Sequence, residues 1–195
     1  MNRWVDSLNR LRATADATTL SSSQWHAGEA VVALLRAHNT VNLYGLPGTG
    51  KTYLGWALAR MTGARLVPSP GRLAGLDRYG PVASRLGPGL TGHWPDARLD
   101  GVVIVDQCPD SRTLARSVVS DVTDAGFRRA VVVTQAPISD HFPHVELRLT
   151  PDDLPRVLAG LAGAGWPVQA PARPVTSLWD LVWPPGLGNA ELPIG

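Results

Sequence analysis

The chain has 195 residues and a mass of about 20.8 kDa, with 44% hydrophobic and 17% charged residues. This length and composition allow one compact domain, whereas two full domains would be cramped. The 18 basic residues nearly balance the 16 acidic ones, and the net charge of +2 does not favour binding to nucleic acid or to a membrane surface. A single cysteine, Cys108, excludes an internal disulfide framework and a multi-cysteine metal site.

Two further features bound the class of protein. No apolar run approaches the roughly 18 residues of a membrane helix, and the first residues lack the apolar segment of a signal peptide. We therefore expect a cytoplasmic protein.

The basic residues are almost all of one type, since 17 of the 18 are Arg and Lys51 is the only lysine. Composition bias explains why Lys is rare, but it does not explain where the remaining lysine stands.

Short apolar strands alternate with helical patterns along most of the chain. In chain order we expect the following elements: helix 2–13, a polar stretch 14–23 whose serines can cap the next helix, helix 24–38, strand 40–44, helix 51–62 ending at Gly63, strand 64–67, a long Gly- and Pro-rich loop 68–100, strand 101–105, helix 111–125, strand 130–134, strand 145–149, and a helix from Thr150 to about Gly163. Residues 166–195 form a Pro- and Trp-rich tail. Unbroken apolar strands alternating with helices predict an α/β fold with a parallel sheet covered on both faces.

One motif indicates chemistry directly. The segment Gly45-Leu46-Pro47-Gly48-Thr49-Gly50-Lys51-Thr52 fits G-x-x-x-x-G-K-[ST] at every fixed position. Glycines let consecutive backbone N–H groups turn inward towards phosphate oxygens, and the helix that follows favours a bound anion at its N-terminus. Lys51 would place a compact ammonium between the β- and γ-phosphates, where the planar guanidinium of Arg would not fit. Thr52 could ligate Mg²⁺.

This segment resembles the Walker A motif of the P-loop NTPases. The resemblance implies a three-layer P-loop fold of about five parallel strands. It also implies a second apolar strand ending in Asp, the Walker B motif, which would hold Mg²⁺ through water. The segment Val102-Val103-Ile104-Val105-Asp106 supplies it. The implied cofactors are ATP and Mg²⁺, with Thr52 and Asp106 at the metal. The implied nucleotide-binding residues are Gly45, Pro47, Gly48, Thr49, Gly50, Lys51, Thr52 and Tyr53.

The order of elements narrows the branch of the superfamily. The N-K-x-D motif of GTPases cannot exist with one lysine already in the loop, and the L-S-G-G-Q signature of ABC-type ATPases is absent. Small-molecule kinases usually place Walker A nearer the N-terminus. The order is similar to that of the AAA+ and STAND ATPases. In those proteins a further strand lies in the sheet between the Walker A and Walker B strands, and a polar residue at its end senses the γ-phosphate. Thr134 matches that position, with Gln135 beside it. The resemblance covers about residues 24–163 and implies three regions: an N-terminal helix and linker 1–23, an ATPase domain 24–165 and a tail 166–195.

The sequence departs from that pattern where hydrolysis is concerned. Active AAA+ ATPases usually follow the Walker B Asp with Glu, the base that polarises the attacking water, and here Gln107 stands there. Asp110 could substitute only if the turn folds back. The catalytic candidates are therefore Lys51, Asp106, Gln107 and Thr134, and hydrolysis should be slow or need a group from a partner. No arginine finger can be assigned; the candidates for contacts with a neighbour are Arg112, Arg116, Arg128, Arg129 and, as a sensor in the last helix, Arg156.

These observations leave three functions open. The first is a slow ATPase that acts as a nucleotide-controlled switch for another protein. The second is an ATP-binding adaptor with little or no hydrolysis, and the third is a small-molecule phosphotransferase that uses loop 68–100 as its acceptor site. Trp4 near the N-terminus and Trp179 and Trp183 in the tail are candidate anchors for a partner protein or for self-association, and His93-Trp94 could stack on a ligand. A nucleic-acid partner is not indicated.

Overall fold

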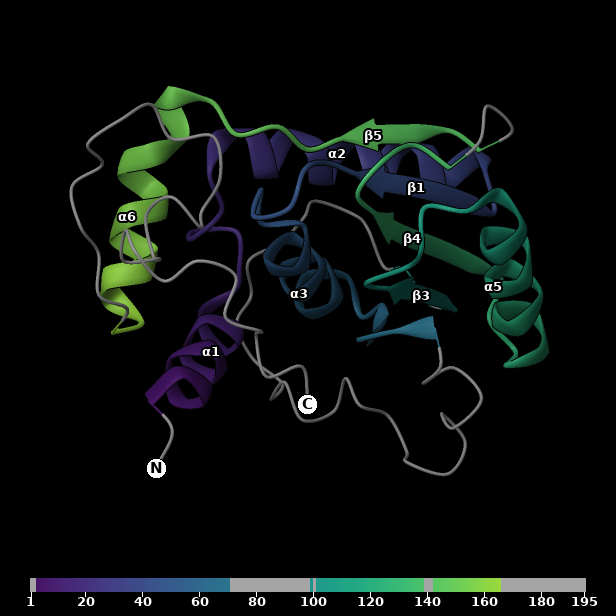
Figure 1. Ribbon diagram of the computed structural model, residues 1–195, viewed down its shortest axis with the longest axis horizontal. Coiled ribbons are helices and arrows are strands. Elements are labelled where there is room, and N and C mark those ends of the chain that lie inside the picture. The colour runs from purple at the N-terminus through teal and green to yellow at the C-terminus, as the bar shows by residue number, and fades with distance from the viewer. Residues whose placement is uncertain (1–2, 71–98, 100, 139–141, 166–195) are drawn as a thin grey trace.

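The computed structural model describes residues 3–70, 99, 101–138 and 142–165, and these form an α/β fold built on one five-stranded sheet (Figure 1). The predicted fold class is confirmed. In chain order the elements are α1 (Arg3–Thr14), α2 (Ser22–Ala37), β1 (Thr40–Tyr44), α3 (Lys51–Thr62), β2 (Arg65–Val67), β3 (Val102–Val105), α5 (Arg112–Asp124), β4 (Arg129–Thr134), β5 (His144–Glu146), the 3₁₀ turn η3 (Pro151–Asp153) and α6 (Leu154–Gly163).

The strand order places three chain segments at one edge of the sheet. The order is β2-β3-β4-β1-β5, and all neighbouring strands are parallel. The pairing of β1 with β4 runs from Thr40 opposite Ala130 to Tyr44 opposite Thr134, so both strands end at the same level. Because parallel strands share the direction of their carboxyl ends, the loop after β1, the turn after β3 and the turn after β4 meet there, where α/β sheets bind their ligands.

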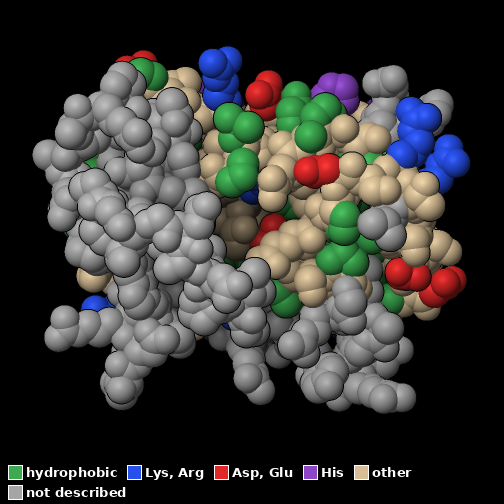
Figure 2. All heavy atoms as spheres, viewed as in Figure 1, with side chains coloured by type: hydrophobic (Ala, Val, Ile, Leu, Met, Phe, Trp, Pro, Cys, Tyr) green, Lys and Arg blue, Asp and Glu red, His purple; other side chains and the backbone are tan. Residues whose placement is uncertain are grey.

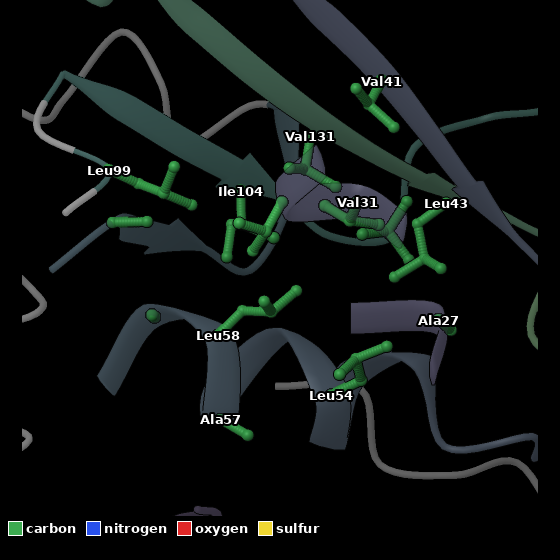
Figure 3. Close-up of a cluster of buried hydrophobic side chains, with 14 of the residues drawn as sticks. Ala27, Val31, Val41, Leu43, Leu54, Ala57, Leu58, Leu99, Ile104 and Val131 are labelled. Atoms are coloured by element: carbon green, nitrogen blue, oxygen red, sulfur yellow. The ribbon is translucent and has the colours of Figure 1, made fainter. Parts of the chain in front are cut away.

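A large apolar core fills the space between one face of the sheet and helices α2 and α3. Figure 3 shows Leu54 and Leu58 of α3 reaching toward the strands that carry Leu43 and Ile104. Leu43, Leu54 and Leu58 are fully buried. Burying a Leu side chain stabilises the fold by about 1.5–3 kcal/mol, so this packing fixes the start of α3 relative to the ends of the strands.

The opposite face carries a second, smaller core beneath α5. Its buried residues are Val67, Val103, Val105, Cys108, Val118, Val122, Ala130, Val132 and Ile138. The sheet is therefore covered by helices on both faces, as the sequence predicts. Cys108 is almost completely buried, and burial raises the pKa of its thiol to about 12. A thiol in this state is a packing residue rather than a nucleophile.

Most element boundaries agree with the sequence, and two do not. Ser21 caps α2 by accepting from the Gln24 N–H at 3.3 Å, and Gly63 ends α3 with a left-handed backbone. The predicted strand 145–149 is shorter, because β1 offers only Asn42 to Tyr44 as partners before it turns into the loop. The predicted helix from Thr150 opens with the 3₁₀ turn η3. Pro155 lacks an N–H and is tolerated only in the first turn of the α-helix that follows.

The N-terminal segment is attached to the same core. Ala15 and Leu20, between α1 and α2, are buried in the larger core. The guanidinium of Arg60 on α3 donates to the backbone carbonyl of Ala13 at the end of α1, and to that of Arg12 at 3.4 Å. The division of the chain into residues 1–23, 24–165 and 166–195 stays a prediction, while the segment before α2 packs on α3 and on the larger core.

The described surface is mixed in character. On the face shown in Figure 2, basic, acidic and hydrophobic side chains are interspersed rather than gathered by kind. In the part of the chain that the structure describes, no helix is both long enough and apolar enough to span a membrane. Most of loop 68–100, including His93-Trp94, and the tail with Trp179 and Trp183 lie outside the described residues, as does the side chain of Trp4.

Candidate functional site

The loop between β1 and α3 has the backbone that the motif requires. Gly48 and Gly50 have positive φ angles of 77° and 87°, which glycine adopts without strain, and Gly50 is the residue from which α3 starts. A Cβ added at Gly45 would lie 2.3 Å from the carbonyl oxygen of Leu147, so only glycine fits there. By helix geometry the first N–H groups of α3 have no partner within the helix. They point out of its N-terminus, where an anion is favoured.

The side chain of Lys51 is bonded to the backbone of the loop that precedes it. Its Nζ donates to the backbone carbonyl of Gly45 and, at 2.9 Å, to that of Leu46. Thr49 is buried and its hydroxyl also donates to the Leu46 carbonyl, at 3.0 Å. Burial lowers the pKa of Lys51, and the negative charges of Asp106 and Asp110 oppose that shift. Lys51 is thus a half-buried ammonium that is bonded to two backbone carbonyls of the loop and attracted by the carboxylates of Asp106 and Asp110.

The two motifs meet through one hydrogen bond. The hydroxyl of Thr52 donates to Oδ2 of Asp106 at 2.7 Å, although the residues are 54 positions apart in sequence. Oδ1 of Asp106 accepts from the Gln107 N–H at 2.9 Å. Asp106 is only 4% exposed, and this burial raises its pKa, while the bonds from Thr52 and Gln107 and the charge of Lys51 oppose the rise. A hydroxyl and a carboxylate side by side offer the hard oxygen ligands that Mg²⁺ prefers.

Gln107 and Thr134 have different surroundings. Gln107 has a left-handed backbone, with φ at 50°, and an exposed side chain. Thr134 is buried, and its hydroxyl donates to the Ala136 carbonyl at 2.8 Å and accepts from the Asn42 amide at 2.8 Å. Its hydrogen is therefore used within the turn that follows β4. The structure places Thr134 at the expected edge, but with its hydroxyl bound to the protein.

Three further polar residues lie at this end of the sheet: Asn42 and Gln24 were not singled out from the sequence, and Asp110 was considered only as a substitute for the missing Glu. Asn42 lies within β1 and is 1% exposed, and besides Thr134 it bonds the Val132 carbonyl and the Ile138 N–H. Gln24, at the start of α2, donates to the Gly50 carbonyl at 3.4 Å. Asp110 accepts from two backbone N–H groups after β4. The only sequence signal for Asn42 was a polar side chain within an otherwise apolar strand.

The side chain of one predicted binding residue, Tyr53, has its partners outside this cluster. The Tyr53 hydroxyl donates to Thr19 at 2.7 Å, and its ring packs edge-on against Trp56, so its side chain lies between α3 and the linker that precedes α2. Pro47, in the loop between β1 and α3, is exposed. A contact of Tyr53 with phosphate would therefore come from its backbone N–H in the first turn of α3.

The arginine candidates are spread around the molecule. Arg128 and Arg129 precede and begin β4, at the end of the sheet opposite to the loop between β1 and α3. Arg112 and Arg116 are exposed on α5, and Arg156 is exposed on α6. Arg148 is exposed directly after Leu147, the residue whose carbonyl abuts Gly45.

Of the comparisons with known proteins, only the one with solved structures finds matches. No family model matches the chain, and no curated protein does. Among solved structures, 24 chains match. One of them is the replication initiator DnaA bound to AMPPCP and single-stranded DNA, at 14% sequence identity and a TM-score of 0.37. The similarity covers 69% of this chain and 48% of that one, so the chain spans about half of the DnaA chain's length.

Proposed function

We propose that the chain binds Mg-ATP in the loop between β1 and α3 and acts as a slow ATPase, a nucleotide-controlled switch whose state another protein detects. The observation that carries this proposal is the 2.7 Å bond between Thr52 and Asp106. This bond joins the two sequence motifs at the carboxyl ends of the strands. Lys51, which donates to two backbone carbonyls of the loop, lies next to Thr52 in the chain.

The residues of the chain can bind phosphate without rearranging the fold. The backbone of residues 45–50 and the N-terminus of α3 supply N–H donors, and Lys51 supplies a positive charge. Lys51 Nζ now donates to the carbonyls of Gly45 and Leu46. On binding, it would exchange these neutral acceptors for phosphate oxygens, and charge-assisted bonds are stronger than neutral ones.

The donor set at Thr52 and Asp106 fits Mg²⁺. No group of three or more His, Cys, Asp or Glu among the described residues could hold a metal ion by itself. A magnesium ion here would be held by Thr52 and, through water, by Asp106, and the phosphates and further water would supply the remaining ligands, as is usual for this ion. When bound, the ion neutralises charge on the β- and γ-phosphates.

The position of β4 supports the resemblance to AAA+ and STAND ATPases. This strand lies between β1, which precedes the phosphate loop, and β3, which ends before Asp106. Gln107 supports slow turnover, because an amide can orient a water molecule but cannot take its proton. Of the described glutamates, Glu29 lies in α2 and Glu146 lies on β5 beside Tyr44, and neither follows β3.

An adaptor that binds ATP without hydrolysing it is the second candidate, and Gln107 favours it equally. The two candidates differ in turnover: a single-turnover assay that detects no ADP over hours would favour the adaptor. The phosphotransferase alternative depends on loop 68–100, which lies almost entirely outside the described residues, so nothing here supports it further.

The binding site is tested by substitution of Lys51. We expect isothermal calorimetry to detect binding of ATP in the presence of Mg²⁺ by the natural chain and to detect none by Lys51→Ala. We expect Lys51→Arg to fail as well, because the guanidinium is too large for the space among the loop carbonyls. Arg60→Lys, which exchanges the same two side chains at the other end of α3, is the matched control and should bind normally. If Lys51→Ala binds as tightly as the natural chain, the site is wrongly assigned.

A further inference from the structure

The turn after β3 folds back onto the end of β4. The left-handed backbone of Gln107 reverses the chain, and the next N–H, that of Cys108, donates to the Val133 carbonyl at 2.9 Å. The buried side chain of Cys108 fixes this reversal in the smaller core. Residues 108–110 therefore run beside the turn that follows Thr134, rather than away from the sheet edge.

This reversal brings the carboxylate of Asp110 to the turn after β4. Oδ1 of Asp110 accepts from the Gln135 N–H at 2.8 Å and from the Ala136 N–H at 3.2 Å. Two donors converge on one oxygen, across 25 positions of sequence. Such charge-assisted bonds to backbone N–H groups are among the strong ones in proteins. The side chain of Asp110 is itself exposed, so it adds little to the core.

The same turn is held from its inner side by a buried network. Thr134 donates to the Ala136 carbonyl, and Asn42 binds both the Thr134 hydroxyl and the Ile138 N–H. This network fixes Thr134, but it supplies no acceptor for the N–H groups of Gln135 and Ala136. Asp110 supplies that acceptor from the chain segment that follows Asp106. Thr134 pairs with Tyr44, the last residue of β1 before the loop, so the turn lies beside that loop. The negative charge of Asp110 also acts on Lys51.

We propose that Asp110 is a positioning residue for the γ-phosphate: its carboxylate holds the turn Thr134–Ala136 in place at the phosphate edge and so lets the protein distinguish ATP from ADP. This inference rests on the proposed binding of Mg-ATP. It assigns to Asp110 a geometric role and not that of the general base missing at Gln107, because the oxygen that the structure shows in use accepts backbone N–H groups.

Three substitutions separate geometry from charge. Asp110→Ala removes the acceptor. Asp110→Asn keeps an oxygen of the same shape and position without the charge, and Asp110→Glu keeps the charge but moves the carboxylate by one methylene. The measured quantity is the ratio of the dissociation constants for ADP and ATP, determined by calorimetry with Mg²⁺ for each variant. Single-turnover hydrolysis is measured alongside.

For a positioning residue, Asp110→Ala should lower the preference for ATP over ADP by about five- to tenfold, with the affinity for ADP changed by less than twofold. Asp110→Asn should retain more of the preference than Asp110→Glu, because its amide oxygen can still accept from both N–H groups, although without the added strength of the charge. Asp121→Ala, an exposed aspartate on α5, is the matched control and should leave the ratio unchanged. If Asp110→Ala fails to fold, the comparison of Asn with Glu decides alone.

Several results would overturn the inference. If the natural chain binds ATP and ADP with equal affinity, it does not distinguish the two nucleotides, and Asp110 cannot be responsible for such a distinction. Equal losses for both nucleotides in Asp110→Ala would show a merely structural role, and a working Glu variant beside a failing Asn variant would show that charge matters instead. Failure of the proposed function looks different: the natural chain then binds neither nucleotide, or Lys51→Ala binds both.

Discussion

At the scale of single residues, we expect Gln107 to limit how fast a bound nucleotide is cleaved. Its side chain is exposed at the edge where Thr52 and Asp106 meet, and its backbone is held by the bond to Asp106. Glu has the same length and would keep this geometry. A carboxylate there could accept a proton from water, which the amide cannot do.

We therefore expect Gln107→Glu to raise the rate of ATP hydrolysis. General-base catalysis typically contributes about 10²–10⁴-fold, and an unoptimised carboxylate should recover at least about tenfold of it. The measurement is phosphate release under saturating ATP and Mg²⁺. Gln107→Met, of similar length but without a polar head, is the control and should show no increase. An unchanged rate in the Glu variant, or a natural chain that already hydrolyses ATP briskly, would contradict a slow switch limited by Gln107.

At the scale of elements, one carboxylate joins the beginnings of two helical segments. Oδ1 of Asp153, in η3, accepts from the Ser23 N–H at 2.9 Å in the first turn of α2, and Oδ2 accepts from the N–H and hydroxyl of Thr150. Burial by itself would raise the pKa of Asp153, but the hydrogen bonds from Ser23 and Thr150 outweigh it and lower the pKa to about 2. Gln24, on the same turn of α2, donates to the Gly50 carbonyl, so the contacts of Asp153 also support the loop between β1 and α3.

The depressed pKa of Asp153 predicts a specific acid sensitivity. An unfolded Asp has a pKa of about 3.9, so the stabilisation is fully present above about pH 4 and is lost as the pH falls through about 2. We expect Asp153→Asn to lower the free energy of unfolding at pH 7 by about 1–3 kcal/mol and to flatten its dependence on pH between 4 and 2. The measurement is urea unfolding at a series of pH values.

The neighbouring residue provides the control for that experiment. Asp152 is exposed, and Asp152→Asn should leave both the stability at pH 7 and its pH dependence nearly unchanged. If the two variants lose the same stability at neutral pH, the bonds to Ser23 and Thr150 do not stabilise the fold as the geometry indicates.

The elements also show which parts of the fold a single sequence can predict. β3 and β4 are buried parallel strands, and their apolar runs identified them, whereas Asn42 interrupts the apolar run of β1. The glycines and Lys51 identified the loop that follows β1. The length of β5 was not predictable, because it depends on where its partner β1 ends at Tyr44. The bond between Asp110 and Gln135 was not predictable either. A polar side chain in a turn has many possible partners, and only the reversal at Gln107 selects this one.

At the scale of the whole molecule, the candidate site exists only when the sheet is intact. Lys51 and Thr52 follow β1, Asp106 follows β3 and Thr134 ends β4, while the core beneath them includes Ala15 and Leu20 from the segment before α2. A ligand that touches all three strand ends binds the native state and not the unfolded chain. Its binding should therefore stabilise the entire described fold against unfolding, rather than one loop.

This linkage predicts the size of a thermal shift. At a nucleotide concentration about 100 times the dissociation constant, stabilisation is about 2.7 kcal/mol. For a chain of this size, each kcal/mol raises Tm by about 2–4 °C, so Mg-ATP should raise Tm by about 5–10 °C in scanning calorimetry. Removal of the divalent ion with EDTA should shrink the shift, because Thr52 and Asp106 then lose the cation that joins them to the phosphates, and Lys51→Ala should abolish it. A shift of equal size with and without Mg²⁺ would argue against a metal at Thr52 and Asp106 while leaving the phosphate loop in place, whereas a shift that persists in Lys51→Ala would place the nucleotide elsewhere on the molecule.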